Sequence, residues 1–250
     1  MVQLDDFFML SNAVPDISDE EYLKVNLLVD AFDAISRTTY ESLYIIDYHK
    51  KNFLYVSNNP LFLCGHTAKE VQQLGYAFYL SHVPEQEQVM LTEINRAGFD
   101  FFSKIPIVDR VNYTISYNFH LLNGKKKILI NHKLTPVQLT DDGKIWLAAC
   151  VVSLSSRDVD NIEMRKTDEK KIWKYSLESR HWKEEKGITL SEREKDILLL
   201  SAEGYTMNEI ADEISLSLDT IKFYRRKLFE KLNAKNIIEA VAIAANSKFI

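Results

Sequence analysis

Several residue types and motifs that mark protein classes are scarce or missing in this 250-residue chain. Its two cysteines, Cys64 and Cys150, form no Cys-x-x-Cys pair, so neither a disulfide framework nor a zinc site is expected. Seven glycines and five prolines argue against long disordered tracts. The longest apolar run, Ile145–Val152, is far shorter than a membrane-spanning helix.

Catalytic signatures are missing as well. The sequence has no P-loop, no Gly-x-Gly-x-x-Gly motif, and no His, Asp or Glu cluster with metal-ligand spacing. No Ser–His–Asp or Cys–His arrangement can be assigned from the sequence. We therefore expect no enzymatic activity, no catalytic residue and no metal site.

The net charge and the N-terminal residues limit where the protein is located and which partners it can have. The first ten residues, MVQLDDFFML, are acidic and lack the basic segment of a secretory signal, so we expect a cytoplasmic protein with no membrane partner. The formal net charge of -5 argues against nucleic acid wrapped over the whole surface, but it allows one local basic element. A chain of this length suits two domains.

Two segments are predicted to flank a central folded block. Residues 1–40 are expected to be helical, because apolar residues recur at helical spacing: Leu27, Leu28, Ala31, Phe32 and Ile35. Residues 157–187 are highly charged and are predicted to be a linker that contains one small hairpin, Ile172–Tyr175 with His181–Lys183. The alternative is a solvated linker whose aromatic side chains rest on a neighbour.

Residues 41–156 have the pattern of an antiparallel sheet covered by helices on one face, which makes the chain an α+β protein. A hairpin is followed by helical segments and then by three strands. The predicted elements are Leu43–Asp47, Phe53–Ser57, a helix near Pro84–Phe102, Tyr113–Leu122, Lys127–Leu139 and Ile145–Leu154. Asn123-Gly124 and Asp142-Gly143 stand between the last three strands and favour tight turns. The last strand is apolar on both faces, so the sequence does not decide which face lines a cavity.

Residues 188–250 carry start signals for four helices. Ser191–Glu194 and Thr206–Glu209 have the spacing of capping boxes. Ser217 and Asn236 are suited to begin the third and fourth helices. Two short helices joined by a tight turn, with the second one basic, are typical of a helix-turn-helix.

The third of these helices, residues 218–232, is predicted to have one basic face. Ile221, Leu228 and Leu232 recur at helical spacing and should face the core. The opposite side can enter a major groove, where cations bind guanine edges or phosphates, and hydroxyls at helix starts can bind phosphate. The predicted DNA-binding residues are Thr206, Ser217, Thr220, Lys222, Phe223, Arg225, Arg226 and Lys227. The alternative is a solvated basic surface without a partner.

The stretch LSEREKDILLLSAEGYTMNEIADEISLSLDTIKFYRRKLFEKLNAKNIIEAV resembles the LuxR-type (GerE-type) helix-turn-helix. The shared features are Leu190, Arg193, Glu194, Gly204, Glu209-Ile210-Ala211, Ser217, Thr220, Lys222, Lys231-Leu232 and Glu239-Ala240. Tyr224 and Lys227 depart from it, because the family often has His and Asn at these positions.

This resemblance implies a four-helix DNA-binding domain whose last helix pairs two protomers. Lys222, Phe223 and Arg226 would read bases. The dimer contacts would be Ala240, Ile243 and Ala244, unless these side chains pack only within their own domain.

Residues Leu43–Leu154 resemble a PAS domain, notably at FLYVSNNPLFLCGHTAKEVQQLG. The resemblance implies a sensory or dimerising module with a small-molecule cavity between sheet and helices. Flavin photochemistry would need a cysteine where the chain reads GYAFYL, so Cys64 is predicted to be a buried core thiol. Haem would need an axial ligand, and the candidates are His66, His82, His120 and His132. No cofactor is assigned, the ligand-binding residues stay unknown, and an unidentified small-molecule ligand is left open.

Together these patterns predict a cytoplasmic, homodimeric, one-component transcription regulator. It would bind double-stranded DNA through residues 218–232, with RNA polymerase as a further candidate partner, and a PAS-like sensor would control it.

In one alternative the PAS-like block is a ligand-free dimerisation or protein-interaction platform. A second alternative is a sigma-factor-like protein, which would need helices where residues 41–156 read as strands. In the third alternative the PAS-like block is an enzyme, and the sole support for this is a set of scattered histidines and carboxylates.

Overall fold

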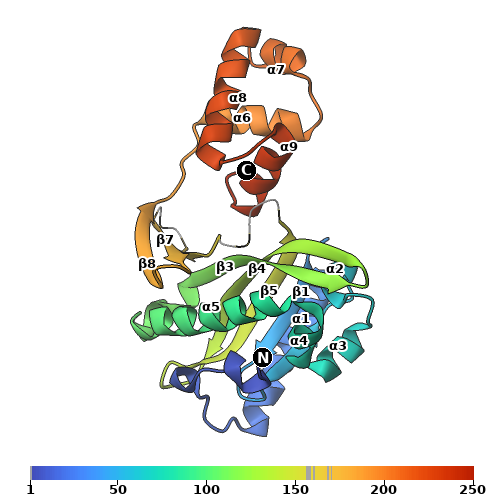
Figure 1. The fold of residues 1–250 in the computed structure, drawn as a ribbon, viewed down its shortest axis with the longest axis vertical. Helices are drawn as coiled ribbons and strands as arrows, with labels where there is room; N and C mark the ends of the chain where they lie inside the picture. Colours follow the sequence, from blue (N-terminus) through green and yellow to red (C-terminus); the bar gives the residue numbers. More distant parts are fainter. Residues whose placement is uncertain (1, 156–158, 160, 168, 170) are drawn as a thin grey trace. The chain divides into compact units, whose positions relative to one another are not determined.

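The computed structural model describes residues 2–155, 159, 161–167, 169 and 171–250. The chain divides into two units, Met1–Glu185 and Lys186–Ile250, which are taken separately below (Figure 1). The domain boundary predicted between residues 156 and 157 falls on positions that lie outside the described residues.

The first unit is built on an antiparallel sheet. Its strands are β1 (Ser42–Asp47), β2 (Asn52–Val56), β3 (Tyr113–Asn123), β4 (Lys126–Leu139), β5 (Ile145–Leu154), β6 (Glu163–Lys166), β7 (Lys171–Ser176) and β8 (His181–Lys186). They lie in the order β2-β1-β5-β4-β3-β6-β7-β8. Three of them, β6 to β8, lie where the sequence suggested a linker with one hairpin, and they extend the sheet beyond β3.

Alternation along the strands sets the core face of the sheet. Ile115, Tyr117, Phe119 and Leu121 of β3 are all buried in one cluster, as period-2 alternation requires. The turn after β3 contains Gly124 with a φ of +57°, a left-handed conformation that glycine adopts without strain. The β3–β4 hairpin follows the predicted strands and the predicted Asn-Gly turn.

Short helices and one long helix cover this core face. They are η1 (Leu4–Phe7), η2 (Leu10–Asn12), α2 (Pro60–Leu63), α3 (Ala68–Leu74), α4 (Ala77–His82), α5 (Glu85–Ser103) and η3 (Ile107–Asn112). The hairpin β1–β2, the helices α2 to α5 and the three strands β3 to β5 follow one another as the PAS resemblance implies. The first unit is therefore a PAS-like α+β domain with an extended sheet.

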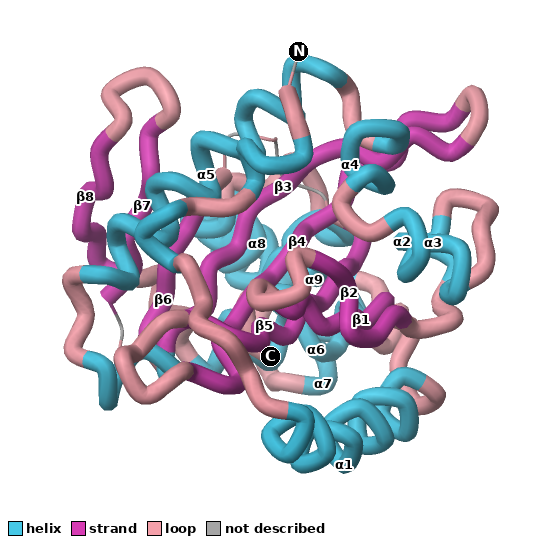
Figure 2. Tube along the Cα trace, turned by 90° about the horizontal axis from the view of Figure 1, so that it is seen from below, coloured by secondary structure: helices cyan, strands magenta, loops and turns pink. Residues whose placement is uncertain are grey.

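Helix α1 (Asp19–Ser36) covers the opposite face of the sheet (Figure 2). Its Val25 packs with Ile45 of β1 and with Trp146 and Leu147 of β5. This second layer explains why β5 is apolar on both faces, since Cys150 of the same strand lies in the core under α5.

Within residues 1–40, predicted to be helical, the α-helix covers only Asp19–Ser36, and its predicted apolar stripe is partly wrong. Leu27 is 77% exposed and Ile35 is 54% exposed. The helix instead turns Val25 into the core, with Leu28 and Phe32 partly buried beside it. The periodicity of apolar residues correctly indicated a helix, but the side of the helix that packs on the sheet is rotated from the predicted stripe.

Four helices form the second unit: α6 (Glu192–Ala202), α7 (Met207–Glu213), α8 (Leu218–Leu232) and α9 (Ile237–Asn246). Their core is a separate cluster that includes Ile197, Ile210, Ile221 and Leu228. The capping boxes predicted at Ser191–Glu194 and Thr206–Glu209 are both formed, so these two helix starts are confirmed. Among the described residues, no helix has the length and apolar character needed to cross a bilayer.

Candidate nucleic-acid interface and sensor cavity

Helices α7 and α8 are joined by a tight turn. The backbone N–H of Leu216 donates to Ala211 at 2.9 Å, and Ser215 has a φ of +53°. Ser217 then caps α8, because its hydroxyl accepts from the Thr220 N–H at 3.2 Å. The local sequence thus fixes both the end of α7 and the start of α8, which is the geometry that a helix-turn-helix requires.

The apolar and basic faces of α8 are separated as predicted. Ile221, Leu228 and Leu232 are buried in the core of the second unit. Phe223 is 44% exposed and lies on the face of α8 away from the core. An exposed aromatic among cations is able to contact a thymine methyl group.

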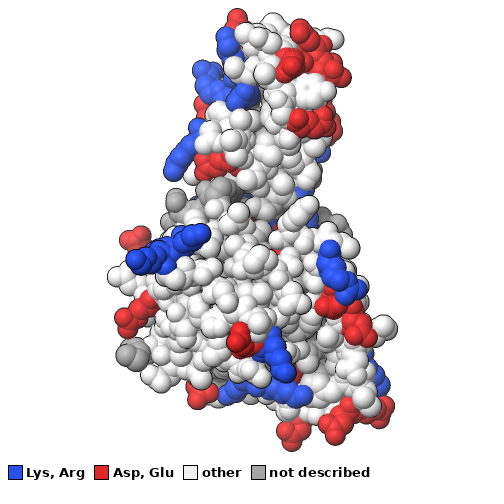
Figure 3. All heavy atoms as spheres, turned by 90° about the vertical axis from the view of Figure 1, so that its right-hand side faces the viewer, with Lys and Arg blue, Asp and Glu red and all other residues white. Residues whose placement is uncertain are grey.

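The cations on the exposed face of α8 make only weak local contacts. Lys222 pairs with Asp219 at 3.1 Å, and the Lys227 ammonium lies 4.6 Å from the centre of the Phe223 ring. Arg226 approaches Glu230 only to 4.0 Å. Exposed pairs of this kind contribute little stability, so phosphate can replace them at small cost. In Figure 3 most basic side chains of the C-terminal part lie along its left edge and most acidic ones along its right edge, with some acidic atoms beside the basic ones.

Arg225 differs from the three neighbouring cations Lys222, Arg226 and Lys227. It is half-buried, with its guanidinium carbon 5.8 Å from the centre of the Phe229 ring, and burial lowers its pKa. It lies on the flank between the exposed face and the core, so Lys222, Arg226 and Lys227 share a face that Arg225 only borders.

The two predicted hydroxyl sites have different surroundings. The Thr206 hydroxyl donates to Glu209 at 2.7 Å, and the Thr206 backbone N–H donates to the same carboxylate at 2.7 Å. These bonds lower the pKa of Glu209 and keep a negative charge at the start of α7. At the start of α8, Ser217 bonds with the Thr220 hydroxyl at 2.8 Å. Both helix starts carry one carboxylate in the first turn, and Asp219 at the start of α8 is paired with Lys222 at 3.1 Å.

The residues predicted to pair two protomers lie in the interior. Ala240, Ile243 and Ala244 are buried in the core of their own unit, which corresponds to the alternative that the sequence left open. Their side chains have almost no surface to offer a second chain. Ile238 of the same helix is 80% exposed and points away from that core.

An ion pair buried on its acidic side connects α6 to α8, and the sequence analysis did not predict it. Lys231 donates to Glu194 at 2.7 Å, and the Glu194 side chain is almost fully buried. Glu194 also accepts from the Ser191 N–H at 2.7 Å. Both charged residues belong to the LuxR resemblance, so their joint presence was the signal that could have revealed the pair. The contact fixes the end of α8 against the start of α6.

Comparison with known proteins identifies this second unit. The family described as "Bacterial regulatory proteins, luxR family" matches residues 188–244. Residues 188–244 form a LuxR-type domain. The response regulator UvrY of Escherichia coli is 39% identical to the chain over 56 residues, which is 22% of this chain and 26% of UvrY. The transcriptional regulatory protein DesR of Bacillus subtilis is 44% identical over 52 residues, 21% of this chain and 26% of DesR.

The chain spans about a quarter of the length of these curated relatives, and the matched part is the LuxR-type domain. Among solved structures, a phage VqmA–DPO complex matches 94% of this chain and 92% of its own, at 16% identity and a TM-score of 0.31.

The PAS-like unit has a hollow between α5 and the sheet. Its wall is formed by Ile94, Asn95, Gly98, Phe99 and Phe102 of α5 and, across from them, by Tyr48, Ile115, Tyr117, Leu134 and Ile145. The hollow itself has a volume of about 20 Å³, room for one or two water molecules, and reaches about 300 Å³ only when open solvent is counted. This hollow lies on the sheet face that α5 covers.

The four candidate haem ligands have different partners in the PAS-like unit. His132 is buried, its Nε2 lies 2.5 Å from the Tyr44 hydroxyl, and burial lowers its pKa to about 3. His120 contacts Glu87 at 2.8 Å, and His66 and His82 face each other with their Nε2 atoms 3.2 Å apart. Across the described residues, no three His, Cys, Asp or Glu side chains are grouped to hold a metal.

Cys64 has the environment of a core thiol. Its side chain is buried, and burial raises the pKa of the thiol to about 11. A thiol with a raised pKa is mostly protonated at neutral pH and reacts slowly. The prediction of a buried core cysteine is confirmed.

Proposed function

We propose that this protein is a DNA-binding transcription regulator that inserts α8 into the major groove. The observation that supports this most directly is the exposed face of α8, where Lys222, Phe223, Arg226 and Lys227 lie together within a LuxR-type domain. Ser217 and Thr220 at the start of this helix would bind phosphate and set its register. Thr206 and Arg225 would border the contact.

We propose that two copies of the chain bind one site. Two-fold pairing places the half-sites about one helical turn apart, on a pseudo-palindromic sequence. Because Ala240, Ile243 and Ala244 are buried, the exposed Ile238 is the side chain of α9 that a second copy would cover. Analytical ultracentrifugation of Ile238→Asp would test this pairing, and an unchanged mass would place the dimer contact elsewhere.

Arg226→Ala is expected to weaken binding to a selected operator by at least about 1 kcal/mol, or roughly fivefold, because a bidentate contact to a base is lost. Fluorescence anisotropy with labelled DNA measures the change. Lys195→Ala is the matched control, since Lys195 is a cation on α6 paired with Glu192 at 2.9 Å. Equal effects of the two substitutions would contradict the assignment of the recognition face.

Lys227→Ala is expected to reduce the slope of log affinity against log salt by about 1, with similar losses on specific and unrelated DNA, because one phosphate contact disappears. The measurement is a titration series at several salt concentrations. If the affinity of the wild-type protein for DNA did not depend on salt, the proposed phosphate contacts would be wrong.

We propose that the PAS-like unit controls DNA binding through a small molecule held in the hollow under α5. The residues that line the hollow are largely apolar, with Tyr48, Asn95 and Tyr117 as polar groups, so a small and mostly apolar ligand would match their chemistry. Because the hollow is only about 20 Å³, such a ligand would enter by displacing α5 or the side chains around it. A native mass spectrum of the purified chain, with a visible absorption spectrum, tests this. Excess mass or a visible band would support a bound ligand, whereas a bare protein would favour a weakly held metabolite or the ligand-free platform.

The sigma-factor-like alternative has little support, since residues 41–156 contain the strands β1 to β5.

A further inference from the structure

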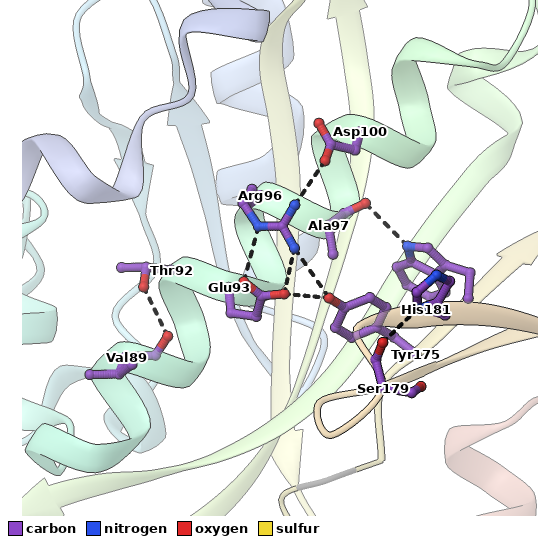
Figure 4. Close-up of polar contacts among 10 residues, drawn as sticks. Val89, Thr92, Glu93, Arg96, Ala97, Asp100, Tyr175, Ser179 and His181 are labelled. Carbon is purple, nitrogen blue, oxygen red and sulfur yellow. Dashed lines mark hydrogen bonds and ion pairs between the residues drawn. The ribbon is translucent and has the colours of Figure 1, made fainter.

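The hairpin β7–β8 is fastened to the outer side of α5 by polar contacts (Figure 4). The Tyr175 hydroxyl of β7 donates to the Glu93 carboxylate and lies 3.4 Å from Arg96. Arg96 in turn binds Glu93 at 2.6 Å and Asp100 at 3.1 Å. The hydroxyl thus joins a short network of charges along one side of the helix.

Aromatic packing fastens the second strand of the same hairpin. The indole N–H of Trp182 in β8 donates to the Ala97 carbonyl at 3.2 Å. The centre of its ring lies 5.1 Å from Phe101 and 5.0 Å from Tyr175. Most other side chains of β8 are exposed, so Trp182 is the main anchor of this strand. A strand held by one neighbouring strand and one anchor is marginally stable, so its order depends on α5.

The opposite side of α5 lines the hollow in the PAS-like unit. Gly98 and Phe99 belong to the wall of the hollow, whereas Glu93, Arg96 and Ala97 hold the hairpin. One helix of 19 residues therefore touches both. Because a hydrogen-bonded helix moves as a rigid rod, a shift on one of its sides is carried to the other.

The hairpin also leads directly into the LuxR-type domain. Strand β8 ends at Lys186, and Ser191 caps α6. Only Gly187–Leu190 separate them along the chain. A change in the position or order of β8 is therefore a change at the entry to the DNA-binding unit.

We propose that the β7–β8 hairpin is a strap that transmits the position of α5 to the LuxR-type domain. Filling the hollow displaces α5, and the displacement alters the anchors at Tyr175 and Trp182. Strand β8, which precedes α6 along the chain, then changes its order. The proposal rests on the proposed function, because it describes how the same sensor hollow regulates DNA binding. It assigns Tyr175 and Trp182 as positioning residues that do not touch ligand or DNA.

The test uses a wedge in place of an unidentified ligand. A Cβ atom at Gly98 would lie 3.4 Å from Cδ1 of Ile115 on β3, so the larger side chain of Gly98→Leu presses α5 away from the sheet. Hydrogen exchange of residues 181–190 and affinity for selected DNA are then measured on the full-length chain. Both are measured with the strap intact and with it loosened by Tyr175→Phe together with Trp182→Phe.

With the strap intact, the wedge is expected to raise exchange in residues 181–190 and to shift DNA affinity, each by about fivefold. With the strap loosened, exchange in this segment is already high and the wedge adds no further shift in affinity. Tyr55→Phe is the matched control, because it removes a tyrosine hydroxyl bonded to Asp33 and Ser36, far along the chain from α5. If Gly98→Leu does not fold, Gly98→Val gives the same comparison with a smaller wedge, because its methyl groups extend beyond the Cβ position.

Two results would contradict the proposal that the β7–β8 hairpin acts as a strap. One is unchanged exchange in residues 181–190 while the amides of α5 itself respond to the wedge. The other is an equal shift in DNA affinity with and without the anchors. Failure of the proposed function is a separate outcome: a wild-type chain that binds no double-stranded DNA would end that proposal, while the exchange measurement would still decide whether α5 moves the hairpin.

Discussion

Glu194→Ala is expected to lower the free energy of unfolding of the LuxR-type domain by about 2 kcal/mol, because it leaves the Lys231 cation without its partner and removes a capping box. Glu194 is almost fully buried and bonds Lys231 at 2.7 Å. Lys231 is 40% exposed and can regain water, so the loss is smaller than for a pair buried on both sides. Hydrogen exchange of α6 and α8 amides in the full-length chain measures the change.

The control for this prediction is Glu192→Ala on the same helix. Glu192 pairs with Lys195 at 2.9 Å, but its side chain is 84% exposed, so we expect less than about 0.5 kcal/mol. If both variants lose equal stability, the effect comes from the first turn of α6 and not from the ion pair.

The same carboxylate predicts a pH dependence. Burial alone would raise the pKa of Glu194, but the Lys231 ammonium and the Ser191 N–H and hydroxyl outweigh it and lower the pKa below its ordinary 4.5. A group with a lowered folded pKa stabilises the fold fully above the unfolded pKa. Stability is then lost as the pH falls below 4.5 and through the folded pKa. Urea unfolding followed by circular dichroism should show a weaker loss in Glu194→Gln.

Phe62→Ala is expected to cost the PAS-like unit about 3–5 kcal/mol, because it empties a fully packed site in the core. The Phe62 ring stacks on Tyr44 with centroids 4.4 Å apart and lies 4.9 Å from Phe78. All three tryptophans of the chain lie within residues 1–185, so tryptophan fluorescence during urea unfolding reports this unit selectively.

Phe223→Ala serves as the control in the other unit. Phe223 is an exposed ring on α8, so the tryptophan transition should keep its midpoint. A loss below about 1 kcal/mol in Phe62→Ala would show that this core is loosely packed, contrary to the aromatic contacts around it.

The helices of the second unit could be predicted from the sequence because short-range interactions determine where they begin. Each capping box needs only two residues three positions apart, and Ser191 with Glu194 and Thr206 with Glu209 form the predicted bonds. The faces of α8 followed from helical spacing and agree with the burial of Ile221. The role of that face in binding DNA stays a prediction, since burial alone does not reveal a partner.

Long-range contacts explain what the sequence could not supply. The stripe on α1 was misplaced because Leu27 is apolar whether or not the sheet covers it. Strand β6, with the sequence EMRK, has no apolar alternation, and it forms by pairing with the edge of β3. The hollow under α5 is lined by residues from elements that are far apart in the sequence, so no local sequence pattern predicts it.

The added strands also change where the sheet ends. Without them β3 would be an outer strand, with its hydrogen-bonding groups available to strands of other molecules. With them the outer strand on this side is β8, whose sequence HWKEEK is mostly charged and whose Glu184 and Glu185 pair with Lys171 and Lys174 of β7. Lysine and glutamate along an outer strand oppose the addition of a foreign strand, so the segment protects the folded protein from aggregating edge to edge.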